Sequence, residues 1–271
     1  MSNPRFLVLL ALLLSLPLVV RAGLVVGEPG QGRAAGPGTV LVAGASGRTG
    51  QLIVRMLADQ GFEVRPLTTS ASSARTRTGL DIDWLEVDVR DAAAVAAAMS
   101  GVDYVISAVG ASEWRGANSP KYVDYGGVVN LVDAATAEGV RHFVLISSAA
   151  AGPHREHRDN PRRGYVLYWK TRGENHLRAS GLDYTVLGPG RLADGDPDGH
   201  RGIVLQSRET YQRAKVVRAD VARVAVEVLS QPHARNRSFA IVNDDGASRD
   251  QWRVQLREPW SRADTIRADS R

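Results

Sequence analysis

Three glycines within Thr39–Gly50 have the spacing of a phosphate-binding turn. Gly44, Gly47 and Gly50 follow a short apolar run at 40–42 and precede apolar residues that recur at helical spacing. Glycine has no Cβ, so such a loop can turn sharply out of a strand and let its backbone approach a pyrophosphate. The free N–H groups and the dipole of the helix that follows then favour the negative charge. The stretch predicts dinucleotide binding, with a plain tight strand-to-helix turn as the alternative.

The end of the next predicted strand, residues 62–67, indicates which dinucleotide is bound. NAD-specific sites place a carboxylate there for the ribose 2′-hydroxyl, whereas this chain reads V-R-P-L-T-T-S. Arg48 lies inside the glycine loop and Arg65 lies on the strand. A missing acid beside guanidinium groups favours a 2′-phosphate, so NADP(H) is predicted over NAD(H). Arg65 could instead point into solvent.

The elements that position this loop alternate between strand and helix. Apolar runs predict further strands at 83–89, 103–109, 142–148, 184–187 and 238–242, and amphipathic stretches predict helices at 91–99, 120–138, 165–179 and 220–229. This order predicts an α/β fold with a doubly wound parallel β-sheet, a Rossmann fold, in a single domain with a small C-terminal extension. Asp220 is expected to cap its helix, and residues 191–217 are expected to be irregular with short strand-like pieces.

Residues at the carboxyl ends of the predicted strands extend the candidate site. Asp88 could reach the adenine or its ribose, or it could serve as an N-cap-like turn residue before the helix at 91–99. Small residues around Gly110 leave room for a cofactor to cross the sheet edge. The expected cofactor-binding residues are Gly44, Ser46, Gly47, Arg48, Thr49, Gly50, Arg65, Asp88, Val89, Ala108, Val109 and Gly110.

The start of the chain differs in composition from the rest. A basic start at Arg5 precedes an apolar run at 6–20 and small residues at 20–22. This layout predicts a secretory signal or membrane anchor over 1–22, a Gly/Pro-rich linker over 23–38, the Rossmann domain over 39–243, and a C-terminal helix and frayed tail over 244–271. The protein is therefore expected to be exported or anchored, with membrane association through residues 6–20 only. A mis-assigned start or a buried helix is the alternative and would leave the protein cytoplasmic, where soluble NADP(H) is available.

Composition excludes several classes of function. The 271 residues contain no cysteine, which rules out disulfides, thiolate metal ligands and cysteine nucleophiles. The net charge of +5 is carried by scattered arginines without a compact basic block, so no nucleic-acid partner is predicted. His154 and His157 have no further ligand nearby in the sequence, so no metal site is predicted.

Five stretches of the chain resemble motifs of the atypical short-chain dehydrogenase/reductases. They are V-L-V-A-G-A-S-G-R-T-G, Y-V-D-Y-G-G-V-V-N-L-V-D-A-A, F-V-L-I-S-S, Y-W-K-T-R-G-E-N-H-L-R-A-S-G-L-D-Y-T-V-L-G-P-G and R-A-D-V-A. Within that superfamily the chain is similar, over 39–243, to the NAD(P)H-binding branch that includes NmrA-like and plant plastid-associated proteins. The resemblance implies a Rossmann fold that binds NADP(H). It also implies Lys170 on the nicotinamide ribose, Ser147 or Ser148 near the nicotinamide, and Pro189 beside the carboxamide.

The chain departs from this family at two positions. Ordinary members carry a tyrosine four residues before the lysine, where its phenol passes a proton, but this chain has Val166. Tyr165 and Tyr168 are close in sequence, yet helical geometry places neither on the face of Lys170. Gly188 stands where relatives often have arginine.

Two functional hypotheses follow. In the first, the protein is an NADPH-dependent oxidoreductase of a small carbonyl or quinone-like substrate, in which Lys170 orients the ribose and Ser148 or a water donates the proton. In the second, it is a non-catalytic NADP(H)-binding sensor or scaffold. The loops that would shape the substrate pocket contain no recognisable motif, and the oligomeric state is not indicated.

Overall fold

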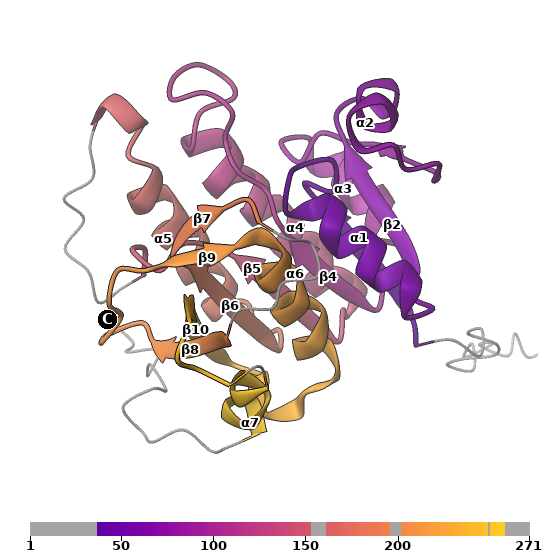
Figure 1. The fold of residues 1–271 in the computed structure, drawn as a ribbon. Helices are drawn as coiled ribbons and strands as arrows, with labels where there is room; N and C mark the ends of the chain where they lie inside the picture. Colours follow the sequence, from indigo (N-terminus) through magenta and orange to yellow (C-terminus); the bar gives the residue numbers. More distant parts are fainter. Residues whose placement is uncertain (1–36, 153–160, 196–201, 249, 258–271) are drawn as a thin grey trace, which may run out of the picture. The chain divides into compact units, whose positions relative to one another are not determined.

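Eight strands form one sheet in the order β3-β2-β1-β4-β5-β6-β10-β8 in the computed structural model, which describes residues 37–152, 161–195, 202–248 and 250–257 (Figure 1). Every neighbouring pair in this sheet is parallel except β10 and β8. The predicted Rossmann fold with a mostly parallel sheet is therefore confirmed. The strands of the sheet are β1 (Thr39–Ala43), β2 (Glu63–Thr68), β3 (Leu85–Glu86), β4 (Tyr104–Ser107), β5 (His142–Ile146), β6 (Tyr184–Pro189), β8 (Gly202–Ser207) and β10 (Arg237–Asp244).

Helices cover both faces of the sheet. They are α1 (Gly50–Asp59), α2 (Ala71–Thr78), α3 (Ala92–Met99), the π-helix η1 (Lys121–Gly127), α4 (Val128–Glu138), α5 (Val166–Ala179), α6 (Arg218–Glu227) and α7 (Gln251–Arg257). The 3₁₀ segments are Pro161–Arg163, Val228–Ser230 and Pro232–Ala234. A small separate sheet pairs β7 (Arg191–Ala193) with β9 (Lys215–Val217) in parallel.

The alternation of side chains along each strand divides the core into two layers. In β1, Val40 and Val42 pack into the layer under α1 and α6, whereas Leu41 and Ala43 pack into the layer under α3 and α4. Successive strand residues point to opposite faces, so a strand covered on both sides is apolar throughout. Figure 1 shows α1 and α6 next to each other on one face. The carboxyl ends of the parallel strands thus lie together along one edge of the sheet, where ligands of such folds bind.

Several element boundaries differ from the prediction. The helix at 71–78 was not predicted, because A-S-S-A-R-T-R-T has no apolar stripe; Ser70 caps its start and Gly79 ends it with a left-handed residue. The third strand contains only residues 85–86. Asp220 lies inside α6, whose N-cap residue is Val217, so the predicted capping role of Asp220 is wrong. Within 191–217 the strand β8 joins the main sheet through antiparallel pairing with β10.

The predicted N-terminal segment at 1–22 and all of the predicted linker at 23–38 except its last two residues lie outside the described residues, as do His154 and His157. In the described part of the chain, no helix combines the length and the apolar character needed to cross a membrane. The same residues contain no group of three His, Cys, Asp or Glu side chains that could hold a metal ion.

Candidate functional site

A narrow cleft of about 150 Å³ lies where the carboxyl ends of β1, β2 and β4 meet. Five predicted cofactor-binding residues line it, namely Gly44, Ser46, Val89, Val109 and Gly110, together with Leu67, Thr68, Thr69, Val87 and Val123. The structure therefore brings the glycine loop and the end of β4 together as the sequence suggested.

Two glycines of the glycine loop are packed too closely against neighbouring backbone for any side chain. A Cβ on Gly44, whose φ is +74°, would lie 2.7 Å from the carbonyl oxygen of Ala108. A Cβ on Gly50 would lie 2.2 Å from the carbonyl oxygen of Gly44. Thr49 is the N-cap residue of α1, and the N–H of Gly47 donates to the carbonyl of Gly44 at 3.0 Å. The loop thus connects Gly44 and Ser46 of the cleft to the start of α1, and the N-terminus of a helix favours negative charge.

Three charged residues of the predicted site point elsewhere. Arg65 donates to the carbonyl oxygens of Ala98 and Ser100 at 2.8 and 2.6 Å, at the C-terminal end of α3, and it is not among the residues that line the cleft. Arg48 is exposed and pairs with Asp194 at 3.2 Å in a separate hollow. Asp88 binds Arg90 through both carboxylate oxygens, and this hydrogen bonding lowers the pKa of Asp88.

A different guanidinium lies beside the glycine loop. Arg77 of α2 donates from Nη1 to the carbonyl oxygen of Ser46 at 3.4 Å. The end of β2 adds hydroxyl groups, with Thr68 Oγ1 donating to Ser46 Oγ at 3.2 Å. Sequence reasoning missed Arg77 because it belongs to the helix that had not been predicted.

Lys170 is fixed by a buried carboxylate that the sequence did not single out. Its Nζ lies 2.6 Å from Oδ1 of Asp124, whose side chain is fully buried in η1. The other oxygen, Oδ2, accepts from the N–H of Ala111 at 3.0 Å. A Cβ on Gly110, which lines the cleft, would lie 4.0 Å from Oδ1 of Asp124, so this ion pair holds the Lys170 ammonium group near the cleft. The only available signal was the motif Y-V-D-Y-G-G, which contains Asp124.

A larger cavity of about 630 Å³ lies at the carboxyl ends of β5 and β6. Ser148 and Pro189 line it, and so does Val166, which stands in the place of the usual tyrosine. Lys170 is one helical turn beyond Val166 on α5, so its backbone lies next to this cavity. Its ammonium group is held by Asp124, next to Gly110 of the glycine cleft.

The NAD(P)H-binding family model matches residues 44–232, well over half of the chain. This protein belongs to the NAD(P)H-binding family. Its relatives include a chloroplastic protein of Arabidopsis thaliana, At2g34460, which is 34% identical over 75% of this chain and 75% of its own length. Sanguinarine reductase of Eschscholzia californica is 29% identical over 74% of this chain and 87% of its own length. The structure of the anaerobillin reductase ChuY from Escherichia coli O157:H7 is similar at a TM-score of 0.63 and 25% identity, over 76% of this chain and 98% of that one.

Family membership supports a nicotinamide dinucleotide as the cofactor. The glycine cleft could hold part of that group, because its lining residues are small or apolar. Neither the matched family nor the relatives named above distinguish NADP from NAD.

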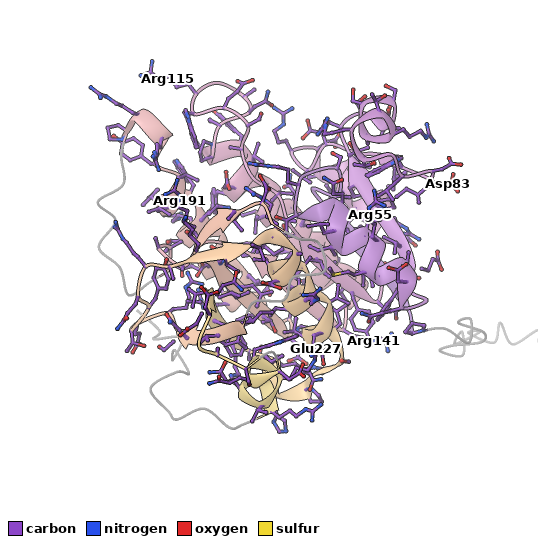
Figure 2. The ribbon with its side chains drawn as sticks, viewed as in Figure 1. Arg55, Asp83, Arg115, Arg141, Arg191 and Glu227 are labelled. Atoms are coloured by element: carbon purple, nitrogen blue, oxygen red, sulfur yellow. The ribbon has the colours of Figure 1, made fainter. Side chains whose placement is uncertain are left out.

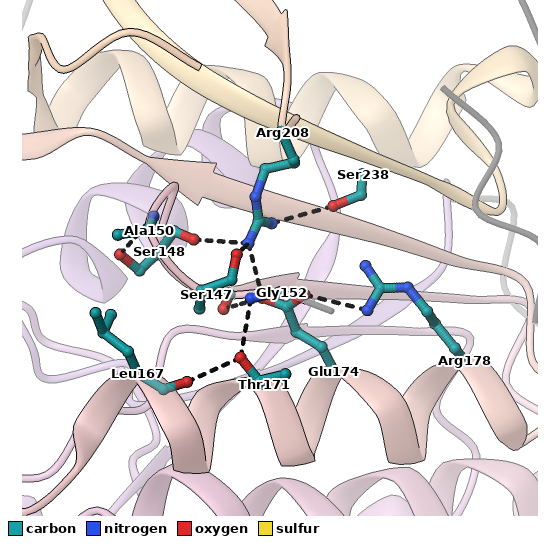
Figure 3. Close-up of polar contacts among 11 residues, drawn as sticks. Ser147, Ser148, Ala150, Gly152, Leu167, Thr171, Glu174, Arg178, Arg208 and Ser238 are labelled. Carbon is teal, nitrogen blue, oxygen red and sulfur yellow. Dashed lines mark hydrogen bonds and ion pairs between the residues drawn. The ribbon is translucent and has the colours of Figure 1, made fainter. Parts of the chain in front are cut away.

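The two serines after β5 have different surroundings in this family member (Figure 3). Ser148 lines the cavity, and its Oγ accepts from the N–H of Ala150 at 3.3 Å. Ser147 is buried and donates its hydroxyl proton to Oε1 of Glu174 in a short hydrogen bond. Both serines were candidates for a position near the nicotinamide. Ser148 is the one that lines the cavity, whereas the Ser147 hydroxyl is hydrogen-bonded to Glu174.

Glu174 is the centre of a buried polar network that connects α5 to β8 (Figure 3). Its Oε1 accepts from Nη2 of Arg208 at 3.0 Å, and its Oε2 accepts from Nη1 of Arg178 at 3.1 Å. Burial alone would raise the pKa of Glu174, but the two guanidinium groups and the Ser147 hydroxyl outweigh it and hold that pKa below its ordinary value. The network fixes the backbone on which Ser148 sits, since Nη2 of Arg208 also donates to the Ser148 carbonyl at 2.7 Å.

Arg208 accounts for the glycine at position 188. A Cβ on Gly188 would lie 2.9 Å from Cζ, Nε and Nη1 of Arg208, so the guanidinium fills the space of a side chain there. Sequence comparison with the family showed that an arginine was absent at 188. It gave no indication that a guanidinium would reach the same place from β8.

Proposed function

We propose that this protein is an NADPH-dependent oxidoreductase that reduces a carbonyl or quinone-like group in the cavity beside β5 and β6. The supporting observation is the position of Lys170, whose ammonium group Asp124 holds near the dinucleotide cleft and whose helix lines a cavity that contains hydroxyl groups. Two relatives are named as reductases, of sanguinarine and of anaerobillin. When bound, NADPH would supply the hydride.

The chain's own residues would position the reactants and supply the proton. The Lys170 ammonium group would bind the ribose hydroxyls, as the family resemblance implies. The Ser148 hydroxyl and the Tyr211 phenol both line the cavity, so either could donate a proton to the oxygen of the reduced group. Val166 contributes only an apolar surface in the place of the usual tyrosine.

Replacing Lys170 by methionine tests this function. We expect kcat/KM for substrate-dependent NADPH oxidation, over a panel of aldehydes, ketones and quinones, to fall about 100-fold or more. Lys170→Arg keeps the charge opposite Asp124 and reports on folding, and Lys121→Ala is the matched control because Lys121 is an exposed lysine of η1, the element that carries Asp124. Wild-type protein that binds NADPH tightly but turns over nothing in the panel would favour the second candidate, an NADP(H)-binding sensor, which the missing tyrosine at 166 supports.

We also propose that the cleft prefers NADP(H) over NAD(H), with Arg77 rather than Arg65 facing the 2′-phosphate. Hydroxyl groups of Thr68, Thr69 and Ser70 occupy the place of the usual acid, and Arg77 reaches the adjacent Ser46. The N–H of Ala71 at the start of α2 is already bound by Glu86 at 2.6 Å, so the side chains carry this preference.

The preference predicts unequal effects on the two cofactors. Arg77→Ala should raise the Kd for NADPH about tenfold, because one charged contact is worth about 1.4 kcal/mol or more, and should change the Kd for NADH less than twofold. Arg75→Ala, an exposed arginine of the same helix, is the control. Fluorescence titration measures the Kd for NADPH and for NADH of the wild type and of both variants. Equal wild-type affinities for NADPH and NADH would contradict the preference.

Finally, we propose that residues 1–22 form a targeting segment. The apolar run at 6–20 supports this, as does the chloroplastic location in the name of the Arabidopsis relative.

A further inference from the structure

The cavity beside β5 and β6 has a strongly positive rim. Four of its lining residues are cations, Arg163, Arg191, Arg213 and Lys215, and none of its lining residues is acidic. They come from the 3₁₀ segment before α5, from β7, from the loop after β8 and from β9. Figure 2 shows Arg191 next to the small sheet that contains β7. Segments that are distant in sequence thus place positive charge around one opening.

These cations are not neutralised within the described part of the chain. Their side chains have no ion pair or hydrogen bond to another described residue, whereas Arg48, Arg178, Arg218, Arg223, Arg235 and Arg253 each pair with a carboxylate. Arg191 lies directly opposite Lys215 in the pairing of β7 with β9. Like charges in facing positions of a sheet are destabilising. An anion bound between them would relieve this repulsion.

The rest of the cavity is lined mainly by apolar residues. They include Ala150, Val166, Leu167 and Pro189, and the hydroxyl groups come from Ser148 and Tyr211. A rim of cations around an apolar floor suits a ligand with an apolar body and at least one carboxylate. A ligand that is cationic throughout would be repelled at the same rim.

We infer that the substrate of this site is an organic carboxylate, an apolar carbonyl compound whose carboxylate is bound between Arg191 and Lys215 while its reducible group lies near Ser148. This inference rests on the proposed function, because it takes the cavity to be the substrate site. It adds a substrate class that neither the family nor the fold specifies.

The experiment uses a matched pair of probes, 6-formyl-2-naphthoate and its methyl ester, titrated into the full chain with saturating NADP. The two probes share the naphthalene body and the aldehyde and differ by one charge. The carboxylate should bind wild-type protein at least tenfold more tightly than the ester. Arg191→Gln and Lys215→Gln should each weaken carboxylate binding about tenfold or more and change ester binding less than twofold.

Controls separate this inference from general charge effects and from the proposed function. Arg235→Gln removes one positive charge from the beginning of β6, where Arg235 pairs with Asp183 at 2.7 Å, and should leave both probes unaffected. The Arg191 and Lys215 variants should bind NADPH as tightly as the wild type does, which would show that these two cations do not bind the phosphates of the cofactor. Wild-type protein that binds the ester as tightly as the carboxylate, or binds neither at millimolar concentration, overturns the inference. Those results would leave the proposed function intact if the protein still reduced neutral carbonyl compounds. Tight binding of the carboxylate without any turnover would instead contradict the proposed function and leave the inference about the ligand intact.

Discussion

Replacing Arg208 by methionine is expected to lower the free energy of unfolding by about 3–5 kcal/mol, the usual cost of removing one partner from a buried ion pair. Glu174 is fully buried, and among the described residues the variant would leave it with Arg178 as its only cationic partner. The carbonyl oxygens of Ser148 and Ala151 would lose a charged donor as well. Methionine retains much of the volume over Gly188, so the loss would come mainly from polar groups left without partners.

Chemical denaturation measures this cost directly. Arg213→Met is the matched control, because Arg213 is an exposed arginine a few residues further on and should change stability by less than about 0.5 kcal/mol. The double variant Arg208→Gly with Gly188→Arg tests the role of the guanidinium itself. If a guanidinium over this position is what matters, the double variant should recover part of the stability that Arg208→Gly alone loses. An Arg208→Met variant as stable as the Arg213 control would show that Glu174 does not need this partner.

The loss of stability in Arg208→Met should depend on pH, and the titration of Glu174 decides in which direction. Its pKa in the folded protein is lowered, so its contribution to stability is present above the unfolded pKa and is lost as pH falls through the folded pKa. Without Arg208, burial is opposed by fewer positive charges, so the pKa of Glu174 rises. The stability difference between wild type and Arg208→Met should therefore be largest at neutral and alkaline pH and should narrow in acid.

The parts of the fold that could be predicted are those whose sequence pattern lies within a few neighbouring residues. The buried runs of β1, β5 and β6 and the glycines after β1 depend on local periodicity and on the absence of Cβ atoms. Strand-like pieces were expected within 191–217, but the bounds of β8 and its place in the main sheet were not predicted, because they depend on pairing with β10, which is distant in sequence. Helix α2 was missed because its caps, rather than an apolar stripe, define it.

The candidate site shows the same division. The glycine cleft and Lys170 follow from motifs, so sequence alone could identify them. The partners that fix Lys170 and Ser147 could not be identified in this way, because Asp124 and Glu174 are ordinary carboxylates until folding buries them beside cations from other elements. Arg48 and Arg65 were assigned to the cofactor from sequence position, whereas the direction of a long side chain is decided by the nearest free acceptors, here Asp194 and the last carbonyl groups of α3.

Replacing Gly44 by alanine is expected to weaken NADPH binding about 100-fold, or about 2.7 kcal/mol. The added methyl group would lie 2.7 Å from the carbonyl oxygen of Ala108 and 3.0 Å from the N–H nitrogen of Val109, so the loop or the end of β4 must move. Both segments line the cofactor cleft, and either shift would displace the backbone N–H groups that face the phosphates. The expected loss is therefore in affinity as well as in stability.

Gly61→Ala provides the matched control for this prediction. Gly61 has nearly the same backbone conformation, with φ +78° against +74° at Gly44, but no atom lies within 4 Å of its added Cβ. Both variants carry the cost of about 1–2 kcal/mol for alanine in the left-handed region, so the difference between them isolates the collision with β4. Thermal unfolding should show Gly61→Ala modestly destabilised, and fluorescence titration should show its NADPH affinity unchanged. If the two variants bind NADPH within about threefold of each other, the close approach of the loop to β4 is not what holds the cofactor, and the phosphate-binding role of this glycine fails.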